Sequence, residues 1–487
     1  MAIPPSGIAL VPIGLAFFFF APHKLAQVAI IAAVFAAASV FSLSGGTFPV
    51  GIAPFYFIAL LIALHSIPRW LNYGLNVRLS VPLRVYLQIV TAFVGWAVLS
   101  AFILPILFRG LPVDLGRAGP DATYYTRLPL HWSLSNAGQA GYLLLDLIVV
   151  FHLVEASRTP ADMQAFCTRF CLSGLIVVAV GAYQFVARHC GLPFPRELFN
   201  SNPAWAQLTS QDLNGATRIS ATFDESSGAG SFLSAWVGFE LALASSHDGR
   251  RWLHLAFGLA GIVVVIGTTS TTGYITTAVV LLWMFWRQLI DLSAKRGSAL
   301  IIATIGLLAI AVTVACLITY EGRVLLSDVL LDKAQSGSSL HRMATVARSF
   351  DTLMATYGLG AGLGSDRAMS MAAYIMSNLG LAGVLLFSWL MYSLVRMSRV
   401  VQSAVPAQAS ATICHRAFAV AFAAHLLALV ESGAEISDPV LWLLWGILIA
   451  SIRQRWPAPT GFEAARPDDS PVLDFDPASL NTVYRRI

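Results

Sequence analysis

"VYLQIVTAFVGWAVLSAFILPILF" occupies residues 85–108 and contains no charged side chain. A helix of this length rises about 36 Å, which is enough to cross a hydrocarbon core of about 30 Å. Comparable runs of about 17 to 25 mainly apolar residues recur along nearly the whole chain. Hydrophobic residues make up 57% of the 487 residues and the mean hydropathy is +0.72, unlike soluble domains. The sequence therefore predicts an all-α, polytopic membrane protein.

Thirteen candidate spans follow from this pattern. They lie near 5–22, 25–43, 50–67, 85–108, 138–156, 166–187, 227–246, 252–268, 271–290, 298–320, 371–395, 414–431 and 437–453. Thirteen spans require an outside N-terminus, whereas a re-entrant or merged first pair gives twelve with both ends inside, the arrangement we favour. Residues 1–453 are predicted to form the membrane domain, and residues 454–487, rich in Pro and Asp, a disordered cytoplasmic tail.

Basic residues orient the membrane domain. Those in alternate loops define one side: Arg69, Arg78, Arg84, Arg158, Arg169, Arg250, Arg251, Arg287, Lys295, Arg296, Arg396, Arg399 and Arg416. By the positive-inside rule this side faces the cytoplasm. Three long segments, 109–137, 188–226 and 321–370, are then predicted to face outward.

The outward segments are themselves rich in arginine. Their ten arginines and one lysine are Arg109, Arg117, Arg127, Arg188, Arg196, Arg218, Arg323, Lys333, Arg342, Arg348 and Arg367. Long translocated loops escape the positive-inside bias, so this count can be neutral. Forked guanidinium groups nevertheless suit phosphate recognition better than ammonium groups do.

An outer stretch, "SLHRMATVARSFDTLMATYGLGAGLGSDR" at 339–367, is predicted to begin as an amphipathic helix. Its apolar face, expected to lie against the membrane domain, consists of Leu340, Met343, Val346, Phe350, Leu353 and Met354. Its polar stripe, expected to face a cavity, consists of His341, Thr345, Arg348 and Thr352, flanked by Arg342 and Ser349. The alternative is an interfacial helix whose arginines meet lipid headgroups.

Alternating glycines follow this helix, at Gly358, Gly360, Gly362 and Gly364. They allow tight turning and close backbone approach before the next span. The Walker pattern G-x-x-x-x-G-K-[ST] is absent from the stretch, so we do not expect nucleotide hydrolysis there.

A second outer motif, "RISATFDESSGAG" at 218–230, places Arg218 ahead of Asp224 and Glu225 at a loop-to-helix junction. Carboxylates at such a junction commonly cap the helix and pair with its dipole. The functional interpretation is that Arg218 contacts an anion while Glu225 orients it or accepts a hydrogen bond.

Three features together resemble the O-antigen ligase and polymerase superfamily of bacterial surface polysaccharide assembly. They are the Arg-x-Ser-x-Thr-Phe-x-Glu-x-Ser run at 218–227, the Ser-Ser-x-x-Arg run ending at Arg342, and the Gly-x-Gly-x-Gly string followed by Asn-Leu-Gly-Leu-Ala-Gly at 378–383. With the hydropathy layout, this resemblance covers most of the chain. It implies a fold like that of C-type glycosyltransferases, with a large outer loop containing an amphipathic helix.

The resemblance implies a multi-pass glycosyltransferase of the bacterial inner membrane, with a periplasmic active site and undecaprenyl-diphosphate-linked glycans as donor and acceptor. Ligases of the superfamily have a histidine shortly after the glycine string, whereas residues 367–374 here contain none. This favours a repeat-unit polymerase of exopolysaccharide or O-antigen over a ligase that transfers glycan to lipid A core. A separate chain-length regulator remains open, and no nucleic-acid partner is expected.

Departure of a diphosphate requires electrostatic stabilisation, which arginines can give without a metal or other cofactor. We assign Arg218 and Arg342 as the diphosphate clamp, with Glu225 and Asp366 as candidate catalytic carboxylates. The predicted substrate-binding residues are Arg348, Arg367, His341, Gly362 and Gly364. No outer HxxH, HExxH or DxD cluster suggests a metal site.

Two further interpretations concern other classes. A lipid-linked oligosaccharide flippase or transporter is an alternative function, but it predicts charge through the depth of the bundle rather than at one outer face. The cysteines lack paired zinc-type spacing and are predicted to be packing residues: Cys167, Cys171, Cys190, Cys316 and Cys414.

Overall fold

The computed structural model describes residues 3–43, 50–75, 77, 79–114, 127–204, 207, 212–213, 216–245, 250–291, 337–404, 410–433 and 435–455. Within these ranges the chain is almost entirely helical. The strands form two-stranded antiparallel hairpins, namely β1 (Phe41–Leu43) with β2 (Val50–Ile52), β3 (Pro112–Asp114) with β4 (Arg127–Pro129), and β5 (Asp212–Leu213) with β6 (Ala216–Thr217). The predicted all-α class is confirmed.

Seven described helices are long and apolar enough to cross a membrane. They are α3 (Pro54–Tyr73), α4 (Val81–Leu107), α5 (Leu134–Ala156), α6 (Pro160–Cys190), α9 (Arg251–Thr268), α14 (Met371–Ala404) and α15 (Ser410–Ser432). Shorter apolar helices are α1 (Pro5–Phe20) and the Thr271–Trp286 part of α10 (Thr271–Asp291). The protein is therefore a multi-pass membrane protein, and its lipid-facing surface is supplied by these helices.

Two further helices, α8 (Ser226–Ala244) and α16 (Pro439–Arg455), form the interior of the bundle. Nearly every residue of α8 is buried, and so are residues 440–452 of α16. Helix α8 packs against α9, α10 and α15, and α16 packs against α5 and α15. The many Ser, Gly and Ala residues of α8 let neighbouring helices approach closely, as is usual inside membrane bundles.

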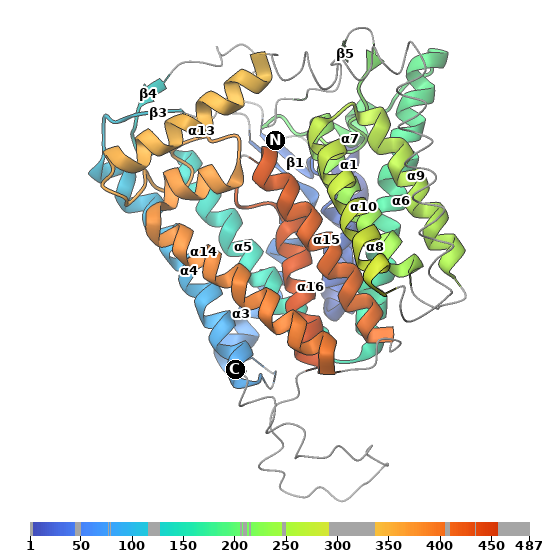
Figure 1. The fold of residues 1–487 in the computed structure, drawn as a ribbon. Coiled ribbons are helices and arrows are strands. Elements are labelled where there is room, and N and C mark those ends of the chain that lie inside the picture. Colours follow the sequence, from blue (N-terminus) through green and yellow to red (C-terminus); the bar gives the residue numbers. More distant parts are fainter. Residues whose placement is uncertain are drawn as a thin grey trace, which may run out of the picture.

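The two ends of the bundle differ. The end that we call the loop end carries the strand hairpins, α7 (Arg196–Phe199) and α13 (Gly337–Ala355) (Figure 1). At the opposite end α3, α5 and α16 finish, and the basic α5–α6 link contains Arg158. The described parts of all three long outer segments thus gather at one end, as their topology predicts.

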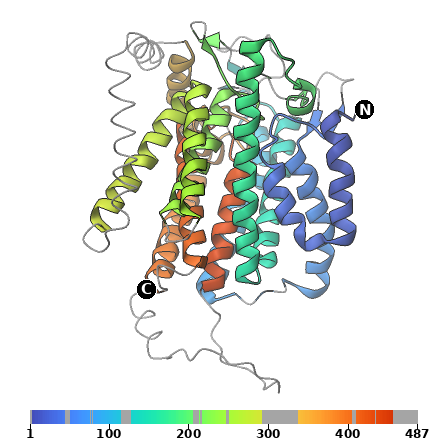
Figure 2. The same ribbon diagram turned by 90° about the vertical axis from the view of Figure 1, so that its right-hand side faces the viewer.

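The beginning of α1 lies at the loop end, where α1 packs against α7 and Ser6 Oγ donates a hydrogen bond to Ser39 O (2.7 Å). Figure 2 shows this N-terminal helix at the edge of the bundle, with its start at the loop end, and it packs against α3 and α2. Because α16 finishes at the opposite end, the described start and end of the chain lie at opposite ends of the bundle. This differs from the twelve-span arrangement with both ends inside and agrees with the thirteen-span alternative, and the number of spans stays a prediction because residues 292–336 lie outside the described residues.

The predicted span 25–43 was wrong as a continuous helix. A short 3-10 turn, η1 (Pro22–Lys24), leads into α2 (Leu25–Ala32), after which the chain leaves helical geometry and reaches β1. Its freed backbone groups find other partners: Ala37 O accepts from Asn202 N (3.0 Å), and Val40 N donates to Ile52 O (2.8 Å). The predicted span 298–320 and almost all of the predicted tail, from residue 456, lie outside the described residues.

Candidate functional site

The segment that carries Arg218 is fixed against α6 and the α9–α10 turn at the loop end. The backbone N–H groups of Ser220 and Ala221 donate to Gln184 Oε1 of α6, at 3.0 and 2.8 Å. Arg218 Nε donates to Thr269 Oγ1, in the turn between α9 and α10, at 3.2 Å. The half-buried guanidinium is therefore held in place before any ligand binds.

Two of the charged groups near Arg218 are Glu225 and Arg342. Burial lowers the pKa of Arg218, nearby Glu225 opposes this shift, and the positive charge of Arg342 adds to it. Arg342 belongs to the first turns of α13, far along the chain, so the fold brings the two arginines of the predicted clamp together. Glu225 is the residue before α8, where its Oε1 accepts a hydrogen bond from Ser227 Oγ.

Asp224 adds a second carboxyl group beside Glu225. Burial and the charge of Glu225 raise the pKa of Asp224 to about 7, although hydrogen bonds from nearby backbone groups act in the opposite direction. Near neutral pH this carboxyl group therefore exchanges its proton readily. A group of this kind can accept a proton from a hydroxyl group.

Helix α13 is turned relative to our prediction, although Leu353 and Val346 of the predicted apolar face still pack inward. Thr345, Ser349 and Thr352 are buried, whereas Met343 and Phe350 are 67% and 56% exposed. The buried hydroxyl groups donate to carbonyls of their own helix, for example Ser349 Oγ to Thr345 O (2.9 Å). Their burial therefore leaves no hydroxyl donor unpaired, and the apolar face is free to contact lipid.

Arg348 points from α13 to the β3–β4 hairpin. Its Nη1 lies 2.8 Å from Asp114 Oδ1, and Arg127 Nη2 of β4 lies 3.5 Å from Thr352 Oγ1. A half-buried guanidinium bound to a carboxylate has less positive charge to offer a ligand. Arg348 therefore joins α13 to the hairpin through this ion pair.

The glycine string docks against a break in α14. The break is at Gly380, which has φ +65°, and Ala361 N donates to Ser377 O while Leu381 N donates to Gly358 O (2.7 and 2.8 Å). The two halves of the third motif that carried the resemblance are thus in direct contact.

Gly362 and Gly364 both have positive φ, +98° and +77°. A Cβ atom on Gly362 would lie 2.6 Å from Ser100 O of α4, and one on Gly364 would lie 3.2 Å from Ser135 O of α5. The structure therefore places these two predicted substrate-binding residues in tight packing between helices.

Asp366 and Arg367 follow the glycines and point to different surroundings. Asp366 Oδ1 accepts from Asp114 N (2.9 Å), and burial raises the pKa of Asp366 to about 6 despite hydrogen bonds to its carboxylate. Asp366 therefore helps to hold β3 in place through this hydrogen bond. Arg367 is exposed, and its charge lowers the pKa of Glu435, which lies in the turn between α15 and α16.

Glu435 and Asp438 make that turn an acidic wall, which our sequence analysis did not assign to the site. Burial raises the pKa of Glu435 overall, and the charge of Glu435 in turn affects Asp224. Asp438 Oδ1 accepts from Leu441 N (2.7 Å) as the cap of α16, and it lies 2.8 Å from His425 Nε2. The signal available in the sequence was an Asp-Pro pair, which is typical of a helix start rather than of a site.

His425 links this wall to α8. Its Nδ1 lies 3.2 Å from Ser231 Oγ, so Ser231, His425 and Asp438 form a continuous hydrogen-bonded chain. Our sequence analysis assigned none of Ser231, His425 and Asp438 to the site. These three come from three separate helices or helix ends, and no spacing rule connects them.

The first turns of α5 hold both walls of the site. Asn136 Nδ2 donates to Leu363 O (2.7 Å) in the glycine string, and Gln139 Oε1 accepts from Ser437 Oγ (2.5 Å) in the acidic turn. The glycine string and the acidic turn are therefore fixed relative to one another.

An open pocket of about 520 Å³ runs along α13 next to this wall. It is lined by Arg342, Met343, Val346, Ala347, Phe350, Met369 and Glu431. The pocket is thus mainly apolar, with one positive and one negative side chain. The sequence of the protein matches no known protein-family model and no curated protein. The chemistry of the site is therefore inferred from the residues described above.

The predicted site residues fall into two groups. Arg218, Glu225 and Arg342 lie together, and Arg367 is linked to them through the acidic wall. Arg348, Asp366, Gly362 and Gly364 instead hold α13, β3 and the glycine string together. The backbone of His341 belongs to α13, but its side chain lies outside the described residues.

Proposed function

We propose that the protein is a membrane glycosyltransferase of the polysaccharide polymerase type. It joins undecaprenyl-diphosphate-linked repeat units at the periplasmic face of the bacterial inner membrane. The observation that carries this proposal is the proximity of the Arg218 and Arg342 charges at the loop end, beside Asp224 and Glu225. The substrate class comes from the resemblance to the O-antigen ligase and polymerase superfamily.

The arrangement suits the chemistry of glycosyl transfer from a diphosphate. When the bond between sugar and phosphate breaks, negative charge develops on the departing oxygen, and the two guanidinium groups stabilise it. The attacking hydroxyl group of the acceptor loses a proton, which Asp224 or Glu225 can accept. The apolar pocket beside Arg342 suits the polyprenyl chain of the donor, because it continues along the exposed apolar face of α13.

Polymerase is preferred to the two alternatives on specific grounds. A ligase is less favoured because no histidine follows the glycine string in residues 367–374. A flippase needs available charge through the depth of the bundle. Away from the loop end, Arg69 is paired with Glu155 (2.8 Å) and His254 with Glu240 (2.7 Å), so these groups are less available to a passing substrate, whereas Asp146 of α5 is buried without a hydrogen-bond partner among the described residues.

The test is incubation of the purified protein with lipid-linked repeat units, followed by gel separation of the products. We expect a ladder, and we expect Arg218→Ala and Arg342→Ala each to lower the rate by about 100-fold or more. Arg196→Ala is the matched control, since Arg196 is an exposed arginine of α7 at the same end.

Two results would overturn the proposal: no ladder from folded wild-type protein with a matched substrate, or wild-type rates in both clamp variants. A parallel reaction contains lipid A core as acceptor. Transfer of glycan to that acceptor without a ladder would identify a ligase instead.

A further inference from the structure

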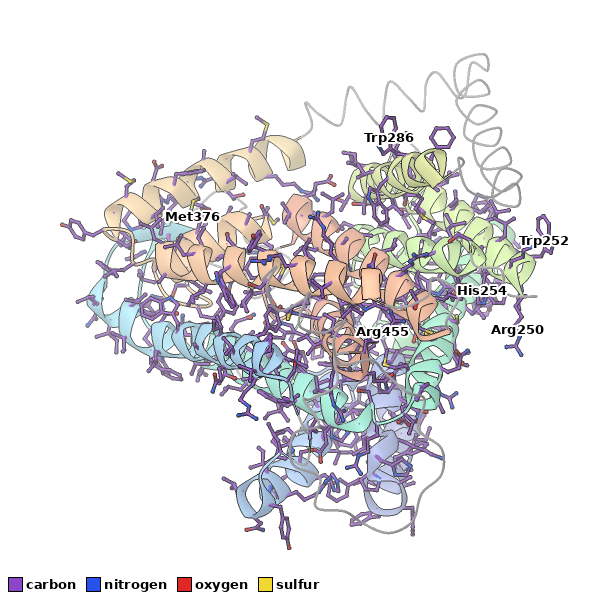
Figure 3. The ribbon with its side chains drawn as sticks, turned by 60° about the horizontal axis from the view of Figure 1, so that its bottom comes forward. Arg250, Trp252, His254, Trp286, Met376 and Arg455 are labelled. Carbon is purple, nitrogen blue, oxygen red and sulfur yellow. The ribbon has the colours of Figure 1, made fainter. Side chains whose placement is uncertain are left out.

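A cluster of three metal-ligating side chains lies towards the opposite end of the bundle. Cys171 of α6, Glu240 of α8 and His254 of α9 each place one potential ligand atom within 4.8 Å of the others. His254 Nδ1 lies 2.7 Å from Glu240 Oε2. Figure 3, which brings this end forward, shows His254 at the start of α9 near Arg250 and Trp252.

The packing of small residues brings the three helices to this distance. Gly174, almost one turn from Cys171 on α6, lies directly against the ring of Trp236 on α8. Gly258, one turn from His254 on α9, leaves room for Leu241, whose Cδ2 would lie 2.9 Å from an added Cβ. Trp236 and Glu240 are one turn apart on α8, so the same face of this helix carries both the close packing and the carboxylate.

Glu240 is the member of the cluster whose burial costs the most free energy. Its side chain is 0% exposed, and Oε1 is buried without a hydrogen-bond partner among the described residues. The His254 imidazole contacts only the other carboxylate oxygen. A buried, incompletely paired carboxylate is costly inside a membrane protein unless a cation or proton neutralises it.

We propose that Cys171, Glu240 and His254 bind a divalent cation of the zinc class. Thiolate, imidazole and carboxylate are together the ligand types that Zn²⁺ accepts in tetrahedral sites. Ligand atoms around a tetrahedral zinc lie about 3.5 Å apart. The atoms of the cluster that are up to 4.8 Å apart need to close by about 1 Å, while His254 Nδ1 and Glu240 Oε2, which lie 2.7 Å apart, need to separate slightly. His254 is 17% exposed, which leaves a route for water to complete the coordination.

Binding is an exchange of the cation for a proton. The Cys171 thiol releases its proton to solvent, its sulfur bonds to the cation, and Glu240 Oε1 acquires the partner that the described residues lack. The cation would join α6, α8 and α9 at a level of the bundle remote from Arg218. It is therefore a site separate from the proposed transferase chemistry.

The test is titration of the full-length protein, in detergent with a phosphine reductant, with Co²⁺ as a spectroscopic probe. We expect one equivalent of Co²⁺ to give thiolate-to-cobalt charge-transfer absorption that Zn²⁺ abolishes. Cys171→Ser removes the band, whereas Glu240→Gln and His254→Asn weaken Co²⁺ binding by about tenfold or more. Zn²⁺ is also expected to raise the thermal midpoint of wild type but not of Cys171→Ser.

Two other cysteines provide controls. Cys190→Ser changes an exposed thiol at the other end of the same helix, and Cys167→Ser changes a thiol one turn from Cys171; both should retain the band. The proposal is overturned if wild type gives no thiolate band, or if the band survives in Cys171→Ser. Should Cys171→Ser fail to fold, undiminished Co²⁺ affinity in Glu240→Gln and His254→Asn overturns it equally.

Discussion

Arg348 Nη1 of α13 lies 2.8 Å from Asp114 Oδ1 of β3, and the backbone N–H of the same aspartate donates to Asp366 Oδ1. One residue thus ties the outer helix to the hairpin and to the end of the glycine string. Arg342 lies six residues before Arg348 on the same helix, so its position depends on how α13 is held. The contacts of Asp114 and the proposed clamp residue Arg342 are therefore linked through α13.

Removal of the Asp114 side chain should loosen α13. In Asp114→Ala the half-buried guanidinium of Arg348 loses its carboxylate, and we expect the free energy of unfolding to fall by about 1–3 kcal/mol. Unfolding in detergent, followed by circular dichroism, measures this. The exposed Asp351→Ala, on the same helix, should change stability little, and equal losses in both variants would contradict the assignment.

The glycine string should tolerate no side chain at Gly362. With φ +98° and only 2.6 Å between a new Cβ and Ser100 O, Gly362→Ala should cost about 1–3 kcal/mol of stability. Gly95→Ala in α4 is the matched control, because a Cβ there meets nothing within 4 Å. We expect it to be neutral or slightly stabilising in the same unfolding assay. A neutral Gly362→Ala would show that the string is not packed as described.

Stability should fall as pH rises, through Asp224. Its pKa is raised to about 7 from an ordinary value near 3.8. Between these values the folded state keeps a proton that the unfolded state has released, so the unfolding free energy declines across this window and levels off above about pH 7. Asp224→Asn should therefore lose less stability than wild type between pH 5 and pH 8, as measured by thermal midpoints.

The control for this pH effect is Asp351→Asn, which alters an exposed carboxyl group on α13. It should show the wild-type difference between the two midpoints. Were Asp224→Asn to show that same difference, its raised pKa could not contribute to the pH dependence.

Lipid should contact the outward apolar face of α13. A fluorophore on a cysteine introduced at Met354, which is 77% exposed, should be quenched by brominated lipid in reconstituted protein lacking other labelled thiols. A fluorophore at Asp351, which is exposed but polar, should be quenched less. Equal quenching at both positions would mean that the apolar face does not select lipid.

The sequence predicts the long helices well because lipid demands a continuous apolar run of fixed length. It misplaces the face of α13 because the helical wheel identifies an apolar face without telling whether protein or lipid covers it. Span 25–43 failed for another reason: the apolar run continues, but distant Asn202 and Ile52 provide its hydrogen bonds. Local pattern cannot reveal such partners.

The residues of the candidate site likewise fall into those that the sequence predicted and those that it did not. Arg218 and Arg342 stand in short motifs and were assigned from the sequence, and the structure places them near one another. The contacts of Ser231, His425 and Asp438, or of Cys171 with Glu240, depend on how separate helices pack. No spacing in the sequence encodes these contacts.

The hydrogen bonds at the start of α5 restrict how the parts of the site can move relative to one another. Asn136 holds the glycine string and Gln139 holds the acidic turn, so these two walls cannot separate without breaking their hydrogen bonds to the start of α5. Arg218 is held elsewhere, by Thr269 in the α9–α10 turn and by the contact of its segment with α6, and Arg342 belongs to α13. The two arginines of the proposed clamp are therefore carried by different elements, and any shift of α13 changes their separation while the two walls keep theirs.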